Sequence, residues 1–83
     1  MQVNEVNEKI KVAAVFDGAR VTPKWFFWGR QKHKVEKVEH TWRSKAGETP
    51  LLFFAVTDGA NVYEIRLDQK KLEWVLEKVY MEG

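Results

Sequence analysis

The side chains of this chain best suited to chemistry are two histidines and a single serine. His33 and His40 are seven residues apart, and an odd separation puts them on opposite faces of a regular strand, so a shared metal ion is not expected. Ser44 follows His40 by four residues within a polar stretch. A nucleophilic serine needs a base held against its hydroxyl, and this spacing provides none. We therefore predict surface histidines, no catalytic residue, no metal site and no cofactor.

Three aspartates complete the reactive set: Asp17, Asp58 and Asp68. Each begins or lies in a predicted turn, where its carboxylate bonds the local backbone, so acid–base work is not expected of them. The chain has no glycine-rich phosphate-binding motif. One further hypothesis is a small enzyme or small-molecule binder that uses the mouth of a barrel, with His33, His40 and Glu39 as its polar groups. Convergence of these side chains in one pocket would support it.

Composition restricts the class of protein. The chain has 83 residues, no cysteine, 45% hydrophobic and 13% aromatic residues. One small domain stabilised by packing alone is therefore expected. No apolar run reaches the roughly 18–20 residues of a membrane span, and the polar start lacks the order of a signal peptide. These features predict a cytoplasmic protein without a membrane partner.

Charge is unevenly distributed although the net charge is only +2. Residues 20–45 hold eight basic side chains against Glu36 and Glu39, a net +6. The flanking segments 1–19 and 46–83 are both net acidic. The central segment is therefore a basic region of an otherwise acidic chain.

Alternating apolar residues and turn signals such as Asp17-Gly18 predict strands rather than helices. The expected strands are 8–16, 21–28, 32–43, 51–57, 62–67 and a last one within 68–80. Two segments are ambiguous. Val35, Val38 and Trp42 also suit a helix, and we prefer a strand with a bulge near Glu36-Lys37. The apolar pattern of 68–80 fits a helical stripe as well, and the strand is again preferred.

The predicted fold is all-β, a six-stranded antiparallel meander curled into a small barrel or a strongly bent sheet. Residues 1–7 are expected to form a disordered tail ahead of a single β domain at 8–83. The polar segment 44–50 is expected to be a mobile, lid-like loop.

Several aromatic and turn residues resemble a family of small bacterial domains of unknown function. The segments that carry the resemblance are 26–30, 54–56, 62–65 and 74–80, with Val35, Val38 and Trp42 between them. That family has a Phe-x-Trp-x-Gly-Arg-like hairpin, a downstream tryptophan and a closing Trp-x-Leu strand. The resemblance spans about residues 20–80 and implies a fold more than an activity.

Two further functional hypotheses follow from the strand pattern. If Phe26 and Trp28 join the core, alternation places four apolar residues on the opposite face. They are Trp25, Phe27, Leu51 and Phe53. An exposed patch of this kind is typical of an interface, and it predicts a non-enzymatic interaction module that forms a homodimer or docks on another protein.

The alternative is a nucleic-acid-binding accessory domain. Its phosphate contacts would come from the basic residues of the central segment, with Trp25 or Phe27 stacking on an unpaired base. The basic residues are Lys24, Arg30, Lys32, Lys34, Lys37, Arg43 and Lys45. The competing interpretation is an ordinary solvated pair of strands.

Overall fold

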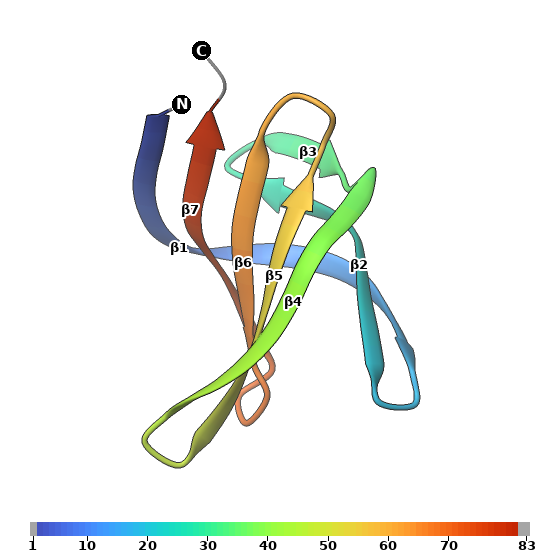
Figure 1. Ribbon diagram of the computed structural model, residues 1–83, viewed down its shortest axis with the longest axis vertical. Helices are drawn as coiled ribbons and strands as arrows, with labels where there is room; N and C mark the ends of the chain where they lie inside the picture. Colours follow the sequence, from blue (N-terminus) through green and yellow to red (C-terminus); the bar gives the residue numbers. More distant parts are fainter. Residues whose placement is uncertain (1, 82–83) are drawn as a thin grey trace.

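Strand β1 (Gln2–Asp17) is the long element that joins the two halves of the sheet. The computed structural model describes residues 2–81 and places β1 beside β7 at its start and beside β2 at its end. Its ladders are irregular between Glu5 and Glu8 and between Ala13 and Ala14. The first irregularity is a bulge in β1 and the second adds Lys24 to β2. A bulge bends its strand, and β1 turns to cross behind β6 and β5 (Figure 1).

The other strands are β2 (Arg20–Trp28), β3 (Gln31–Lys34), β4 (Lys37–Ala46), β5 (Thr49–Thr57), β6 (Val62–Asp68) and β7 (Glu73–Met81). Their order in the sheet is β3-β2-β1-β7-β6-β5-β4, with every pairing antiparallel. The predicted all-β antiparallel class is confirmed. Seven strands are present instead of six, and the strongly bent sheet is not closed into a barrel, because β3 and β4 remain edge strands.

The core lies between the two halves of this bent sheet. Phe26 of β2 packs edge-to-face on Tyr63 of β6, with ring centroids 5.1 Å apart. The fully or nearly fully buried cluster is Phe26, Leu52, Phe54, Val56, Tyr63, Ile65, Leu67, Leu76 and Val79. Each large side chain buried in this way contributes about 1.5–3 kcal/mol. The predicted inward positions of Phe26 and Trp28 are confirmed, since Phe26 is in this cluster and Trp28 packs against it. Leu51, predicted on the opposite and exposed face, is buried.

The segment 32–43 is not one strand. β3 ends at Lys34, and Val35 and Glu36 carry the chain across the core to β4. The Val35 N–H donates to Lys24 O at 2.9 Å and the Glu36 N–H donates to Thr57 O at 2.8 Å, so the two residues bond opposite halves of the sheet. The strand break lies at 35–36, and the bulge in β4 falls between Val38 and His40 rather than at 36–37.

Two other expectations need correction. Residues 2–5 pair with β7 in register from Met81 to Lys78, so this part of the expected tail is strand, while Met1 lies outside the described residues. The expected lid at 44–50 is the end of the β4–β5 hairpin, turning at residues 47–48. The segment 68–80 forms a turn followed by β7, which confirms the strand interpretation. No helix long and apolar enough to cross a membrane occurs among residues 2–81.

Candidate functional site

The two histidines and Glu39 do not converge on one pocket. His33 lies opposite Phe26 in the β2–β3 ladder and faces the core, with rings stacked 4.9 Å apart. His40 lies on the other side of the sheet, against the Trp42 ring at 5.4 Å. Glu39 pairs with Lys37 at 3.3 Å. The geometry therefore gives no support to a small-molecule site built from these three side chains.

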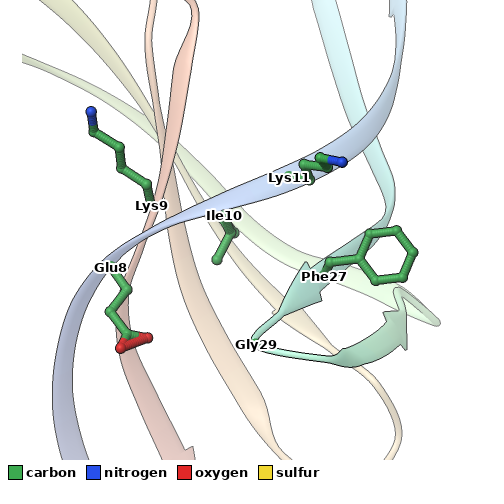
Figure 2. A pocket seen from close by; sticks show the side chains of 6 residues that line it. All are labelled: Glu8, Lys9, Ile10, Lys11, Phe27 and Gly29. Atoms are coloured by element: carbon green, nitrogen blue, oxygen red, sulfur yellow. The ribbon is translucent and has the colours of Figure 1, made fainter.

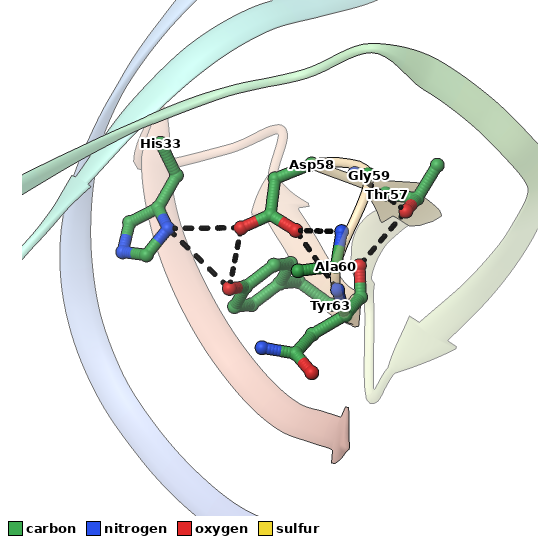
Figure 3. Close-up of polar contacts among 7 residues, drawn as sticks. His33, Thr57, Asp58, Gly59, Ala60 and Tyr63 are labelled. Carbon is green, nitrogen blue, oxygen red and sulfur yellow. Dashed lines mark hydrogen bonds and ion pairs between the residues drawn. The ribbon is translucent and has the colours of Figure 1, made fainter. Parts of the chain in front are cut away.

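His33 belongs instead to a half-buried polar cluster with Asp58 and Tyr63 (Figure 3). The Tyr63 hydroxyl donates to Asp58 Oδ2 at 2.7 Å, and His33 Nδ1 lies 3.3 Å from both oxygens. The His33 side chain is only 13% exposed and that of Asp58 17%. The cluster connects β3 to the turn between β5 and β6, on opposite sides of the core.

The turn itself holds the Asp58 carboxylate in place. Its Oδ1 accepts the N–H groups of Ala60 and Asn61, each at 2.9 Å. Burial alone would raise the pKa of Asp58, but the bonds from Asn61, Tyr63 and Ala60, with a smaller part from His33, lower it to about 2. Burial, with Asp58 as a second cause, raises the pKa of Tyr63 above its usual value. At neutral pH Asp58 is therefore an anion and Tyr63 is its neutral donor.

The cluster is built for stability more than for reaction. A catalytic histidine must reach a substrate, whereas the His33 ring is enclosed by Phe26, Trp28 and Tyr63. Its Nε2 is buried without a hydrogen-bond partner among residues 2–81. The prediction of a surface histidine was wrong here. A two-residue turn at Gly29-Arg30 places His33 opposite Phe26, and that register was the signal in the sequence.

A hollow lies where β1 bends (Figure 2). It measures about 710 Å3 and is lined by Glu8, Lys9, Ile10, Lys11, Phe27 and Gly29. Figure 2 shows Lys9 and Lys11 pointing away from one another, with the Glu8 carboxylate directed elsewhere. Binding sites for small molecules bring a few polar groups to one point, and these side chains do not meet. The hollow therefore offers no arrangement for catalysis.

The four predicted interface residues do not form one patch. Leu51 is only 8% exposed. Phe53 is half-buried and points outward from β5, whereas Trp25 and Phe27 point outward from β2. Because β2 and β6 face each other across the core through Phe26 and Tyr63, outward side chains of the two halves point in opposite directions. The structure thus presents two separate aromatic surfaces.

The first is the β4–β7 face, which we define by Trp42, Phe53, Ala55, Val62 and Tyr80. The Trp42 and Phe53 rings are stacked with centroids 5.2 Å apart and planes 7° apart. A shallow groove of about 360 Å3 runs beside Trp42, and its lining is completed by His40 and Glu64. The Tyr80 hydroxyl donates to Glu64 Oε1 at 3.4 Å. This groove is mostly apolar, with two polar residues at its margin.

Charged side chains on the same side of the sheet are paired with one another. Lys9 pairs with Glu73 at 3.3 Å, Lys78 pairs with Glu5 at 3.8 Å, and Arg66 pairs with Glu77. Exposed ion pairs contribute little stability. Their effect here is to leave the surroundings of the β4–β7 face close to neutral.

The second surface is the β2–β3 face, which we define by Trp25, Phe27, Lys32 and Lys34. The two aromatic rings meet edge-to-face at 5.0 Å, and Lys32 Nζ lies 4.8 Å from the centre of the Trp25 ring. Register places Lys32 beside Phe27 and Lys34 beside Trp25 on the same outer side. The sequence predicted these residues as part of a longer basic segment.

The remaining basic residues of that segment are divided by the strand break. Lys24 and Arg30 are exposed on the β2–β3 hairpin. Lys37 is paired with Glu39, while Arg43 and Lys45 lie on β4, in the other half of the sheet. Only part of the predicted nucleic-acid site is therefore continuous.

Comparisons with protein-family models, with curated proteins and with solved structures give no match to this chain. The resemblance to a family of small bacterial domains therefore stays a prediction. The two aromatic surfaces and the sheet edges are the features of this structure that bear on its function.

Proposed function

We propose that this protein is a non-enzymatic interaction module that binds another protein through the β4–β7 face. The observation that carries the proposal is the stacked pair of Trp42 and Phe53 beside an apolar groove on the outside of the sheet. Aromatic side chains set in apolar surroundings are typical of the centre of protein interfaces. A cytoplasmic location accompanies this proposal as a prediction.

A second copy of the chain is the first partner to test. In a symmetric dimer the same surface meets itself, so an excess of one charge on that surface would oppose association. The ion pairs around the β4–β7 face balance one another, and the Glu64 carboxylate at the groove accepts a hydrogen bond from the Tyr80 hydroxyl. Burial of half of an aromatic side chain removes roughly 75–125 Å2 of apolar surface from water, which contributes about 2–3 kcal/mol per ring. Trp42 and Phe53 contribute in this way from both copies. A micromolar dimer is within reach of these values.

Sedimentation velocity at micromolar concentration tests the proposal. We expect a dimer for the unmodified protein and a monomer for Phe53→Lys, because a lysine at the centre of the interface would be buried without a partner. Phe27→Lys is the matched control, since it places the same charge on the β2–β3 face and is expected to leave the dimer intact.

Circular dichroism establishes that both variants are folded. The proposal is contradicted if the unmodified protein is a monomer and also binds no other protein whose binding is lost in Phe53→Lys. Equal dissociation by Phe27→Lys and Phe53→Lys would contradict the choice of surface.

A second candidate function, single-stranded nucleic acid binding, is supported by a different observation. On the β2–β3 face, Trp25 and Phe27 stand beside Lys32 and Lys34, and ion pairs among residues 2–81 involve neither lysine. Bases stack on aromatic rings while lysines contact the phosphates. This is the kind of arrangement that binds single strands without reading their sequence.

A labelled oligo-deoxythymidine titrated at several salt concentrations tests this candidate. We expect affinity that falls as salt rises and is reduced about tenfold or more by Trp25→Ala. Tyr80→Ala on the β4–β7 face serves as the matched aromatic control. Absence of binding at low salt, or equal losses in the two variants, would remove the candidate.

A further inference from the structure

The bent sheet is left open along one line, between β4 and the first half of β2. β4 pairs only with β5, so the backbone groups on its other edge have no strand beside them. β3 pairs with β2 only from Trp25 to Trp28, so residues 20–23 of β2 extend beyond its reach. Unpaired edges of this kind accept an added strand when another chain offers one.

A groove of about 330 Å3 lies along this line. It is lined by Ala19, Arg20, Val21, Thr41, Trp42, Arg43 and Leu52. Leu52 is a buried core residue, so the groove reaches down to the core. Phe16 pairs with Val21 in the β1–β2 ladder, shares its face, and is 59% exposed. The groove therefore combines an open backbone edge with apolar side chains.

The charge of the groove has one sign. Arg20 and Arg43 are exposed and line it, and Lys45 follows on β4. Its lining contains no carboxylate, and the ion pairs formed within residues 2–81 do not include any of these three side chains. An occupant that brings carboxylates would neutralise charges that the fold leaves unpaired.

We propose that this open line between β2 and β4 binds an extended acidic segment of another protein, which pairs with the β4 edge as an added strand. Apolar side chains of the segment face Val21 and Leu52. Arg43 shares the face of Leu52 in the β4–β5 ladder, so its long side chain reaches carboxylates at the margin of the segment, and Arg20 reaches them from β2. Main-chain bonds provide affinity in this mode and the side chains provide specificity.

A second copy of β4 fits this edge poorly. Lys37, Arg43 and Lys45 give β4 an excess of positive charge over Glu39, and like charges opposite each other destabilise a strand pair. The bulge between Val38 and His40 also interrupts a regular self-pairing. The same charges that disfavour a second copy favour an acidic strand.

The open edge of β4 is a separate surface from the β4–β7 face of the proposed function, although Trp42 borders both. The probe is the fluorescein-labelled peptide Asp-Val-Glu-Val-Thr-Val-Glu-Ile-Asp, with fluorescence anisotropy as the readout. The matched peptide carries lysine at each acidic position. We expect the acidic peptide to bind and the lysine peptide not to bind.

Protein variants locate the site. Arg20→Glu and Arg43→Glu are each expected to weaken binding about tenfold or more. Lys70→Glu, the same charge change in the turn before β7, is expected to leave it unchanged. Phe53→Lys is also expected to bind the acidic peptide normally. Failure of the dimer proposal and failure of the edge-site proposal therefore give different results.

Backbone pairing is tested with two N-methylated versions of the acidic peptide. One version is methylated at every second backbone amide, and the other is methylated at the remaining amides. Only one set faces β4 in an added strand, so one peptide should lose affinity and the other should keep it. Equal binding by both would overturn the proposal, as would no binding at millimolar peptide. Equal losses of peptide affinity in Lys70→Glu and Arg43→Glu would show a general attraction of polyanions. Displacement of the peptide by oligo-deoxythymidine at equal concentration would show the same, and either result would overturn the proposal.

Discussion

Replacing Asp58 with alanine is expected to destabilise the fold more than the same change at Asp68. Both aspartates accept two N–H bonds at 2.9 Å within their own turns. Asp58 also accepts the Tyr63 hydroxyl at 2.7 Å and lies 3.3 Å from His33 Nδ1. Within residues 2–81 the side-chain hydrogen bonds of Asp68 are confined to its turn. The pair of variants therefore separates the bridge across the core from the turn.

The size of the effect follows from these bonds. A hydrogen bond to a charged acceptor contributes about 1.5–3 kcal/mol, and its loss leaves the buried Tyr63 hydroxyl with the longer His33 Nδ1 contact, at 3.3 Å, in its place. The two turn bonds add about 1 kcal/mol. We expect Asp58→Ala to lower the free energy of unfolding by about 2.5–4 kcal/mol, and Asp68→Ala to lower it less. Tyr63→Phe removes both the donor and the need for an acceptor, and should cost about 1 kcal/mol.

Urea titrations followed by tryptophan fluorescence measure these free energies. The double variant Asp58→Ala with Tyr63→Phe should be more stable than the sum of the two single losses implies. Each single variant already removes the hydrogen bond between Tyr63 and Asp58, so the double variant cannot lose it a second time. Equal losses for Asp58→Ala and Asp68→Ala would refute the reasoning. Strict additivity in the double variant would show that the 2.7 Å contact contributes nothing.

Two further predictions concern the same turn. Because the pKa of Asp58 is lowered to about 2, the stability from its carboxylate is present above its ordinary pKa of 3.8 and is lost as the pH falls through about 2. Thermal melts across this range should show the loss, and Asp58→Asn should reduce it; an unchanged acid response in Asp58→Asn would contradict the assignment. Gly59→Ala should destabilise more than Gly47→Ala, because an added Cβ would meet the Glu36 carboxylate at a φ of +96°, whereas Gly47 has open space at a φ of +62°. Equal urea midpoints for the two glycine variants would show that Glu36 simply moves aside.

Much of the fold was predictable from local patterns. Alternation along 51–57 and 62–67 places Phe54 and Ile65 inward, and the structure buries both completely. These predictions succeed because neighbouring side chains of a strand must point to opposite faces. The choice of strand for 68–80 is also correct, but alternation alone does not place its core residues. Leu76 and Val79 are three positions apart, and both reach the core because a bulge lies between them.

The break at Val35 and Glu36 was not predictable in this way. Neither residue belongs to a strand, and neither is a glycine or a proline that would mark the change. The chain stops pairing with β2 and begins to pair with β5 here. The Val35 N–H bonds a carbonyl of β2, and the next N–H, that of Glu36, bonds a carbonyl of β5. That choice depends on where Lys24 and Thr57 lie in space, and a local pattern contains no such information.

By itself the sequence determined the strands, their inward faces and most of their turns, because these depend on residues a few positions apart. Only the tertiary structure decided that β1 pairs with β7, that Trp25 and Phe53 lie on opposite outer surfaces, and that His33 meets Asp58 across the core. These relations join residues far apart in the chain. They are selected by the packing of the whole core, whose free energy is shared among many side chains and cannot be assigned to a short stretch of sequence.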